Sequence, residues 1–478
     1  MATRHDHSTQ DACEEGGPLG AASLSKEPGA VLLYDGERPT CRAIPLGEAA
    51  LELGRGCAAL GANEDPAMSR KHACLAYRQS RFHITDLGGR NGSTLDGKLL
   101  HGEVVSSSPR VLRLGHSLLL LCHDVRPYRV LGVNVDGSRI EGPALQQVMR
   151  QVAGLSMLSR TLLILGESGT GKESLARAFH THGPRPGGPF LAVNCATIPE
   201  GLAERLLLGA QKGAYSGAVA DSPGYLAESS GGTLFLDEIA ELDAAVQAKL
   251  LRVLETGEVT QLGATRARRI ELRTCCATHK PLRELVAQGK FRADLFFRLA
   301  TPHVELPPLR RRPEEIPWYV FNTVRETDSA LRAQASLIET CLLRAWPGNV
   351  RELLLAVRTA SLLARLDGCT NVGAQHLDGQ AGAELRAAPG QGPVGPPATS
   401  SPAPSADEGA GADDEAAVAP PQPATAEATL SRAEVVAAIV KVDGNVSAAA
   451  RELGLQRTQL RRLLVRYQIN VQKLRDLT

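Results

Sequence analysis

The feature that most restricts this chain is a glycine-rich loop that is followed, further along, by two adjacent acidic residues. The loop, residues 166–173, fits the pattern G-x-x-x-x-G-K and lies between an apolar strand and a helix. Its glycines let backbone N–H groups close around a phosphate, and the helix adds the positive end of its dipole. Asp237 and Glu238 end the apolar segment 232–238. Together the two motifs predict a P-loop that binds and hydrolyses ATP with Mg²⁺.

The residue types in these motifs suggest separate chemical roles. Lys172 is expected to reach the β- and γ-phosphates, while Asp237 holds Mg²⁺ and water completes its coordination. Glu238 is placed to orient or deprotonate the attacking water. Glu173 stands where the motif usually has serine or threonine, so one common Mg²⁺ ligand is missing. The predicted nucleotide-binding residues of the loop are Gly166, Glu167, Ser168, Gly169, Thr170, Gly171, Lys172 and Glu173.

Length and composition limit the remaining possibilities. A chain of 478 residues is too long for one core, so about three domains are expected. The net charge of +1 means that any nucleic-acid surface must be local. The 10 cysteines form no C-x-x-C pair, and no apolar run approaches the ~20 residues that span a bilayer. The N-terminus lacks a signal-peptide pattern, and we expect a cytoplasmic protein without a membrane segment.

Composition and periodicity divide the chain into five segments. Residues 1–30 are predicted to be disordered. Residues 31–127 contain short apolar runs separated by turn signals, which predicts a β-sandwich. Residues 138–380 alternate apolar strands with helices, which predicts an α/β fold with helices on both faces of a parallel sheet. Residues 381–427 form an acidic linker rich in Pro, Ala and Gly, and residues 428–478 form a basic helical domain.

The C-terminal segment has the spacing of a helix-turn-helix. From residue 429 onward it holds nine Lys or Arg against four Asp or Glu. Ser431 and Glu434 form a capping box at the start of one helix, and Ala450 and Gly454 permit close helix crossing and a tight turn. A plain basic helical hairpin stays open as the alternative. The predicted DNA-contacting residues are Arg457, Thr458, Gln459, Arg461 and Arg462.

Several motifs in order give the central segment a family resemblance. Besides the P-loop and the acidic pair, these are residues 213–218, 289–299, 307–310 and 346–353. Over about residues 140–380 the chain resembles the AAA+ domain of sigma-54-dependent transcriptional activators, also called bacterial enhancer-binding proteins. The resemblance implies an AAA+ P-loop NTPase with a small helical lid, assembling from dimers to a hexamer. ATP would then bind at the subunit interfaces.

The resemblance also implies roles for individual residues. Arg292 and Arg298 match the arginine fingers that reach a neighbour's ATP, and Arg351 matches the sensor II arginine that acts within its own subunit. Asn194 matches the switch asparagine that engages the Walker B glutamate, and Thr278 matches the sensor I threonine. The loop that would press on sigma-54 consists of Gly213, Ala214, Tyr215, Ser216, Gly217 and Ala218.

This sequence departs from the family pattern at several positions. Tyr215 and Ser216 replace the usual Phe and Thr, but they keep an aromatic ring and a short hydroxyl side chain. Weakened or retained contact with sigma-54 is therefore expected rather than its loss. His279 stands where sensor I usually has asparagine, and Leu355 stands where an asparagine often occurs. Apolar residues 206–208 also replace a polar-flanked segment before the loop.

The N-terminal segment resembles the forkhead-associated (FHA) domain, a β-sandwich that binds phosphothreonine peptides. The resemblance is carried by residues 54–55, 69–72 and 86–93. A dianionic phosphate needs arginine, hydroxyl and backbone donors on loops at one end of a rigid sheet. An FHA-like fold with a silent site stays open as the alternative. The matching phosphopeptide residues are Arg55, Ser69, Arg70, Arg90 and Asn91, and His72 is expected to brace the loops.

The C-terminal helix-turn-helix resembles the Fis-type DNA-binding domain found at the end of such activators. Together these resemblances imply a sigma-54-dependent activator with an N-terminal FHA domain. Its expected partners are sigma-54 RNA polymerase holoenzyme, enhancer DNA, a phosphothreonine protein or peptide, and further copies of itself. One rival interpretation is an adaptor that joins phosphoproteins to DNA without productive hydrolysis. Another is an AAA+ remodeller that acts on a different client.

Overall fold

The computed structural model of the chain describes residues 26–61, 64–199, 201–215, 220–384, 430–442, 445–467 and 469. Most of the predicted N-terminal segment 1–30 and of the linker 381–427 lies outside these ranges. Ser216, Gly217 and Ala218 of the predicted sigma-54 loop also lie outside them.

The N-terminal domain is a sandwich of two antiparallel sheets. The larger sheet has the order β2-β1-β10-β9-β6-β7, and the smaller has the order β3-β4-β5-β8. Aliphatic side chains from the facing sides of the two sheets, with Phe82 and Met68, fill the core between them. The strands are β1 (Gly29–Asp35), β2 (Pro39–Pro45), β3 (Leu51–Leu53), β4 (Ala73–Arg78), β5 (Arg81–Asp86), β6 (Ser93–Leu95), β7 (Lys98–Leu99), β8 (Glu103–Ser106), β9 (Arg110–Leu114) and β10 (Ser117–Cys122).

A short connector joins this sandwich to the central domain. It consists of helix α1 (Arg126–Leu131) and a hairpin of β11 (Asn134–Asp136) and β12 (Arg139–Glu141). Helix α2 (Pro143–Leu158) then begins the central domain, with Pro143 in its first turn, where a missing backbone N–H costs nothing.

The central domain is built on a five-stranded parallel sheet. Its order is β14-β15-β18-β13-β19, from β13 (Thr161–Leu165), β14 (Phe190–Asn194), β15 (Thr233–Asp237), β18 (Arg273–Thr278) and β19 (His303–Glu305). Successive strand residues enter different cores: Leu162 and Ile164 pack with α2 and α3 (Lys172–Thr181), and Leu163 packs on the opposite face. The sheet is therefore buried on both sides, as continuous apolar strands require.

Helices cover the second face of this sheet. They are α4 (Ala203–Leu208), α5 (Tyr225–Glu228), α6 (Ala244–Thr256), α7 (Leu282–Ala287) and α8 (Ala293–Leu299), and their apolar side chains form one core with β14 and β15. A small hairpin of β16 (Glu258–Val259) and β17 (Arg268–Arg269) follows α6.

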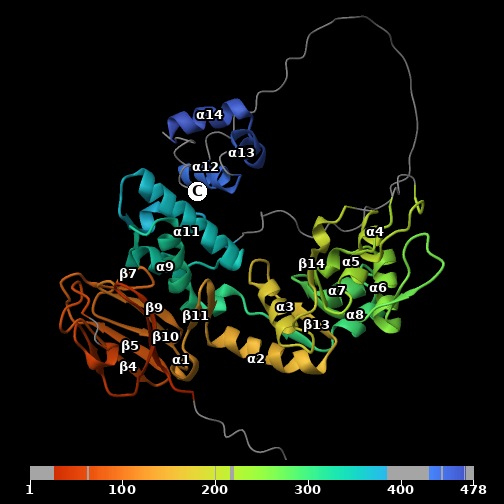
Figure 1. The fold of residues 1–478 in the computed structure, drawn as a ribbon. Helices are drawn as coiled ribbons and strands as arrows, with labels where there is room; N and C mark the ends of the chain where they lie inside the picture. Colours follow the sequence, from red (N-terminus) through yellow and green to blue (C-terminus); the bar gives the residue numbers. More distant parts are fainter. Residues whose placement is uncertain are drawn as a thin grey trace, which may run out of the picture.

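A helical lid follows the sheet in sequence. It contains α9 (Ile316–Thr327), α10 (Ala335–Leu342), α11 (Asn349–Leu366) and the short parallel pair β20 (Arg332–Ala333) and β21 (Asn371–Val372). Figure 1 shows the lid between the N-terminal sandwich and the C-terminal helices, with the central sheet on its other side. Trp346 is the largest fully buried side chain in the described residues and lies in the lid core.

Three helices form the C-terminal domain: α12 (Arg432–Lys441), α13 (Val446–Glu452) and α14 (Arg457–Arg466). The predicted capping box is present, because Ser431 accepts from the Glu434 N–H and Glu434 accepts from the Ser431 N–H. Leu362 and Leu363 of α11 share a core with α12, and Arg432 pairs with Asp367.

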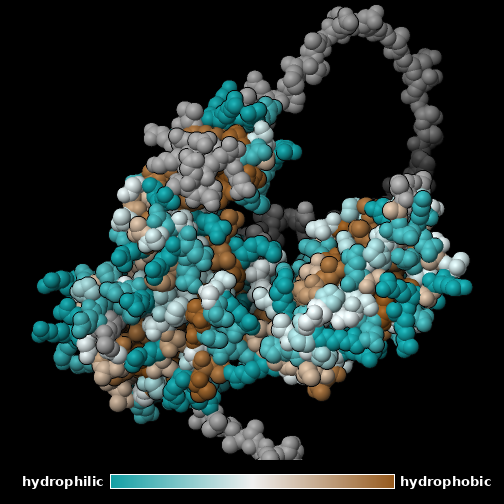
Figure 2. Space-filling model, in the orientation of Figure 1, coloured by the Kyte–Doolittle hydropathy of each residue, from teal (hydrophilic) through white to brown (hydrophobic). Residues whose placement is uncertain are grey.

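The predicted fold class is confirmed: a β-sandwich, a P-loop α/β domain with a helical lid, and a helix-turn-helix. The apolar runs of residues 31–127 lie mainly in β1, β3, β4, β5, β9 and β10, whereas the more polar strands β2, β6, β7 and β8 carry weaker patterns. Among the described residues, no helix is both long and apolar enough to cross a bilayer. The visible face in Figure 2 is mostly hydrophilic, with smaller hydrophobic areas between.

Candidate functional site

The predicted P-loop lies at the carboxyl edge of the central sheet, between β13 and α3. Register brings the other motifs to the same edge, since Leu165 pairs with Thr278 and Asn194 pairs with Asp237. Gly169 has φ +74°, and a side chain there would meet the Gly348 carbonyl at 2.2 Å. Only glycine fits at this point, where the lid touches the loop.

Lys172 is buried and its ammonium group is already occupied. Its Nζ donates to the Gly166 carbonyl (3.2 Å) and lies 3.2 Å from Oε1 of Glu238. The side chain exposes only 6% of its surface, so the Glu238 carboxylate is needed to compensate the buried charge. A bound phosphate would have to replace these protein contacts.

The two acidic residues at the end of β15 lie in different electrostatic environments. Burial raises the pKa of Asp237, and the nearby Glu238 charge adds to this while Lys172 opposes it. Burial also opposes ionisation of Glu238, but the Lys172 charge and a His279 hydrogen bond more than offset it, so its pKa is lowered. Glu238 is held in the left-handed backbone region (φ +52°), which is uncommon for a non-glycine residue. Glu238 is therefore ionised and positioned by its neighbours.

The sensor residues contact Glu238 unequally. His279 Nδ1 lies 2.7 Å from Glu238 Oε2, whereas Thr278 Oγ1 lies 3.5 Å from the same atom. Asn194 caps a short 3₁₀ turn through a hydrogen bond from the Ala196 N–H, and no hydrogen bond to Glu238 is found in the described residues. The predicted Asn194–Glu238 contact is thus not formed here, and His279 holds the carboxylate instead.

The lid closes over the P-loop through the first turn of α11. Asn349 Nδ2 donates to the Ser168 carbonyl (3.0 Å), and the Val350 N–H donates to Gly169 (3.1 Å). Arg351 Nη1 lies 3.4 Å from Ser168 Oγ, so this predicted residue reaches the loop of its own subunit. The sequence motif containing Asn349 could have revealed its role, because it flanks Arg351.

Two further arginines that the sequence prediction did not select also hold the loop. Arg310 makes two hydrogen bonds to Glu167, at 2.7 and 2.8 Å, and these lower the pKa of that carboxyl. Arg312 is fully buried, pairs with Glu315 and donates to the Thr170 carbonyl. The sequence feature that could have indicated these two arginines is the basic run 310–312.

The predicted arginine fingers point elsewhere. Arg292 pairs with Asp294 at 2.7 Å, and Arg298 donates to the Leu254 carbonyl. Both are exposed, and neither makes a hydrogen bond or ion pair with the P-loop of the same chain within the described residues. Phe297 between them is 72% exposed, and its ring contacts the Phe296 ring edge-on.

The residues present fit a Mg²⁺ ion bound mainly by substrate and water. Mg²⁺ is usually held by one or two carboxylates plus phosphate oxygens, and Asp237 supplies such a carboxylate at the strand end. The carboxylate of Glu173, the residue after Lys172, is engaged elsewhere, because it accepts two hydrogen bonds from Arg177. No cluster of His, Cys, Asp or Glu suited to a dedicated metal cage occurs in the described residues.

A small β-bridge lies at the base of the predicted sigma-54 loop, of which residues 213–215 are described. Ala210 pairs with Ser222, which brings the two ends of the segment together. Tyr215 is 40% exposed, and its hydroxyl accepts a hydrogen bond from Arg205 of α4 at 2.8 Å. The Arg205 guanidinium also lies over the ring, 5.2 Å from its centre. A phenylalanine at this position could not form the hydroxyl contact.

The loops at one end of the sandwich bring the predicted phosphopeptide residues together. The Arg55 N–H bonds to the Ser69 carbonyl, the Ser69 hydroxyl accepts from the Arg90 N–H, and Asn91 donates to Ala67. His72 is buried; its Nδ1 accepts from the Ser69 N–H, so Nε2 carries the hydrogen and donates to Gly92. His72 thus braces both loops.

The cations of this loop cluster are not neutralised. Arg55, Arg70 and Arg90 are exposed, and none forms an ion pair with another described residue. In the C-terminal domain Arg457, Arg461 and Arg462 are likewise exposed on α14, while Leu460 and Leu463 anchor that helix in the core. Gln459 accepts from the Gln456 N–H, and Thr458 lies on the same helix.

Comparison with known proteins follows this division of the chain. The FHA domain model matches residues 51–118, the sigma-54 interaction domain model matches residues 139–305, and the model of the bacterial regulatory proteins of the Fis family matches residues 428–467. Each match falls on one of the domains described above.

Curated relatives match about half of the chain. A Nif-specific regulatory protein of Rhizobium etli is 44% identical over 245 residues, covering 50% of this chain and 42% of that protein. The DNA-binding transcriptional regulator NtrC of Rhizobium meliloti is 42% identical over 251 residues, covering 51% and 52%. The chain spans about half the length of the curated relatives it matches.

Among solved structures, NtrX from Brucella abortus is similar at 27% identity with a TM-score of 0.47, covering 68% of each chain. The three matched models stand in the order FHA, sigma-54 interaction and Fis family, which is the order of segments that the sequence motifs predicted.

Proposed function

We propose that this protein activates sigma-54 RNA polymerase by hydrolysing ATP in a ring of its own subunits. The observation that carries this proposal is the carboxyl edge of the central sheet, where Lys172, Asp237 and Glu238 meet under a lid that carries Arg351. In this proposal Lys172 leaves the Glu238 carboxylate and binds the phosphates of ATP. Glu238 is then free to orient the attacking water. Asp237 would hold Mg²⁺, which neutralises charge on the phosphates.

Assembly into a hexameric ring is supported by the position of the predicted arginine fingers. Arg292, just before α8, and Arg298, on α8, are exposed and make no hydrogen bond or ion pair with the P-loop of their own chain within the described residues. The exposed ring of Phe297 lies between them in the sequence. A neighbouring subunit would cover this surface and receive an arginine at its γ-phosphate, where positive charge stabilises the transition state. We further propose that the three functional domains span residues 31–127, 138–380 and 428–478.

The N-terminal domain would receive the regulatory signal, and the C-terminal domain would bind the protein to its DNA site. Arg55, Ser69, Arg70, Arg90 and Asn91 would bind a phosphothreonine peptide, with the free arginines providing charge and fixed geometry. Arg457, Thr458, Gln459, Arg461 and Arg462 would bind enhancer DNA through α14. The loop at 213–218 would transmit hydrolysis to sigma-54.

In vitro transcription tests the whole proposal. Purified protein is added to sigma-54 holoenzyme on a supercoiled promoter, and open complexes are measured with ATP and with the slowly hydrolysed analogue ATPγS. Open complexes should form only with ATP and should disappear with Lys172→Ala. ATPase activity without open complexes, and without binding of sigma-54 in ADP and aluminium fluoride, would indicate another client. Absence of ATPase activity at ring-forming concentrations would indicate an adaptor.

A further inference from the structure

Two strands of the N-terminal sandwich are apolar on both faces. In β1, Ala30 and Leu32 enter the sandwich core, whereas Val31 and Leu33 point out of it. In β10, Leu119 and Leu121 are inside and Leu118 and Leu120 are outside. A sandwich standing alone would carry polar residues on its outer face, so these strands need a second partner.

The lid is that partner. The outward residues of β1, β9 and β10 are buried in one continuous core with α9, α10 and α11 of the lid, including Val320, Leu337, Ile338 and Cys341. Figure 1 shows the sandwich lying directly against α9 on the side away from the central sheet. The two units share a core as elements of one domain do, rather than meeting at a polar contact.

Polar groups fix the register of this interface. The Tyr34 hydroxyl, which is buried, donates to the Ala333 carbonyl of the lid at 3.1 Å. Glu339 of α10 is only 5% exposed, and it accepts from the Thr94 hydroxyl of β6 and pairs with Arg113 of β9 at 2.8 Å. Arg113 Nε also donates to the Thr94 hydroxyl. A buried carboxylate held by two groups of another domain is sensitive to any shift between them.

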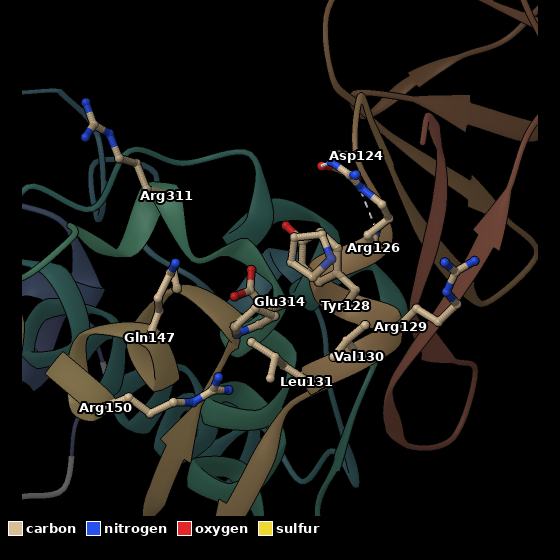
Figure 3. Close-up of a pocket in the computed structure, with 13 residues that line it drawn as sticks. Asp124, Arg126, Tyr128, Arg129, Val130, Leu131, Gln147, Arg150, Arg311 and Glu314 are labelled. Carbon is tan, nitrogen blue, oxygen red and sulfur yellow. Dashed lines mark hydrogen bonds and ion pairs between the residues drawn. The ribbon is translucent and has the colours of Figure 1, made fainter. Parts of the chain in front are cut away.

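A second contact joins the same units through the connector. At this junction, residues of α1, of α2 and of the segment before α9 line a cavity of about 830 Å³. Figure 3 shows Glu314 beside Tyr128 among the residues that line it. Glu314 is 1% exposed, and its Oε2 has no hydrogen-bond partner among the described residues. Tyr128 of the connector also packs against the core that the sandwich shares with the lid, so the sandwich and the lid are joined at two places.

Thr94, which contacts the lid, lies three residues after Asn91 of the predicted phosphopeptide loop. Asn91 lies in that loop, the buried Ser93 donates to Asp86 at its base, and Thr94 is the next residue. His72 ties Gly92 to the other phosphopeptide loop. A change in loop position on ligand binding would therefore reach Thr94 through a short and hydrogen-bonded stretch of chain.

On the lid side, α10 leads directly to the P-loop. Trp346, which follows α10, donates from Nε1 to the Cys341 carbonyl at 2.7 Å, and it is fully buried. Asn349 comes next and bonds the Ser168 carbonyl, while the Val350 N–H bonds Gly169. The segment from Glu339 to Val350 thus spans from the sandwich to the nucleotide loop.

We propose that the outer face of the FHA sheet is a lid-docking surface, and that Glu339 couples occupation of the phosphopeptide loops to the lid and the P-loop. Sandwich and lid then move as one unit. The coupling rests on the phosphothreonine binding proposed above, whereas the docking does not. Coupling of this kind is reciprocal, so ATP must change the affinity for a phosphothreonine peptide by the same factor as the peptide changes the affinity for ATP.

Linkage measurements on the full chain test the coupling. The probe is a degenerate mixture of phosphothreonine heptapeptides, and the affinity for a fluorescent ATPγS analogue is measured with and without it. The wild type should show a change of at least threefold. Glu339→Gln should reduce the change to less than 1.5-fold, with each separate affinity within twofold of wild type. Glu326→Gln, an exposed lid glutamate, should keep the full change.

Two outcomes would overturn the coupling. One is a linkage that survives Glu339→Gln unchanged, and the other is a wild type that binds the peptides without any linkage. Failure to bind phosphothreonine would instead refute the proposed ligand of the FHA domain. The docking is then judged by a separate measurement.

Hydrogen exchange tests the docking surface without any ligand. Leu120→Asp places a charge in the interface and should raise exchange in α10 at least tenfold, while β4 and β5 exchange as in wild type. Val105→Asp, on the exposed side of the smaller sheet, should leave α10 unchanged. The milder Tyr34→Phe, which removes only the bond to Ala333, should raise α10 exchange about threefold. Unchanged α10 exchange in both interface variants would overturn the proposal.

Discussion

The two phosphate-binding regions predicted in this chain are built in opposite ways. At the P-loop the cation is buried and already paired: Lys172 contacts Glu238 and Gly166, and the lid occupies the Ser168 and Gly169 carbonyls. At the end of the FHA sandwich the arginines are exposed and form no ion pair with described residues. The backbone of both regions is held in place by hydrogen bonds to neighbouring loops.

The two regions differ in whether a ligand must replace existing protein contacts when it binds. A ligand at the FHA loops can form charge-assisted hydrogen bonds with exposed arginines without first breaking an ion pair of the protein, so these loops suit direct recognition. A nucleotide at the P-loop must replace Glu238 at Lys172, which releases Glu238 for another role. We infer that the first site is built to bind and the second to change state when it binds. The predictions below test this contrast.

The largest effect is expected from Lys172→Ala. The substitution removes the phosphate-binding cation and leaves Glu238 without its main partner, so ATP turnover should fall by at least about 100-fold. Steady-state phosphate release measures this change. Lys98→Ala, an exposed lysine of the sandwich, is the control and should keep wild-type turnover. Normal turnover in Lys172→Ala would refute the P-loop assignment.

Arg55→Ala should weaken phosphothreonine peptide binding by about 10- to 100-fold, the effect of losing one charged hydrogen-bonding group. Because Arg55 is exposed, the stability of the sandwich should hardly change. Isothermal titration with the phosphothreonine peptide mixture measures the affinity, and Arg38→Ala at an exposed turn is the matched control. Wild-type protein that binds no phosphopeptide at all would favour the silent FHA-like fold.

Glu314 predicts a pH dependence at the sandwich–lid junction. Burial raises its pKa from 4.5 to about 8, with repulsion from Glu315 adding to the shift. Between about pH 5 and 8 the unfolded chain releases a proton that the folded chain retains, so the free energy of unfolding falls as pH rises, by up to about 1.4 kcal/mol per pH unit. Below this window the contribution is fully present. Glu314→Gln stays neutral and should remove this share of the slope.

Urea unfolding at pH 5.5 and 7.5 measures the slope, and Glu326→Gln should leave it as in wild type. Burial also raises the pKa of Glu315, to about 7, despite its pairing with Arg312, so part of the slope should remain in Glu314→Gln. An identical slope in wild type and Glu314→Gln would show that this carboxyl is ionised in the folded protein.

The smallest effect is expected from Tyr215→Phe. The change removes one exposed hydrogen bond to Arg205, worth about 0.5–1.5 kcal/mol, and leaves the ring in place. ATPase activity should stay within twofold, because Tyr215 is not among the residues that hold the P-loop. Release of the loop from α4 should raise open-complex formation about twofold. Arg205→Ala should act in the same direction, and a loss of ATPase activity in either variant would contradict this separation.

Much of the architecture could be predicted from residue patterns. The apolar strand expected before the glycine-rich loop is present as Thr161–Leu165. The FHA loops also follow their pattern, since His72 and Ser69 bond the backbone of neighbouring loops. Strands β6 to β8 were harder to predict, because they are short, partly exposed and carry no alternation of apolar and polar residues.

Contacts between distant side chains were less predictable. The expected partner of Glu238 was Asn194, but Asn194 satisfies a nearby backbone N–H and His279 takes its place. Short polar side chains often bond their own backbone in this way, which a motif alone does not reveal. The hydrogen bonds from Arg310 to Glu167 likewise join residues that are far apart in the sequence.

The sequence by itself determined the three domains, their order and the chemical character of each loop, because glycine, charge and apolar periodicity act locally. The tertiary structure alone decided that the FHA sandwich docks on the lid, and that Glu339 lies between Thr94 and Arg113. The apolar outer face of β1 and β10 requires some cover, but periodicity carries no information about which element supplies it. That choice depends on the shape and charge of two surfaces once both have folded.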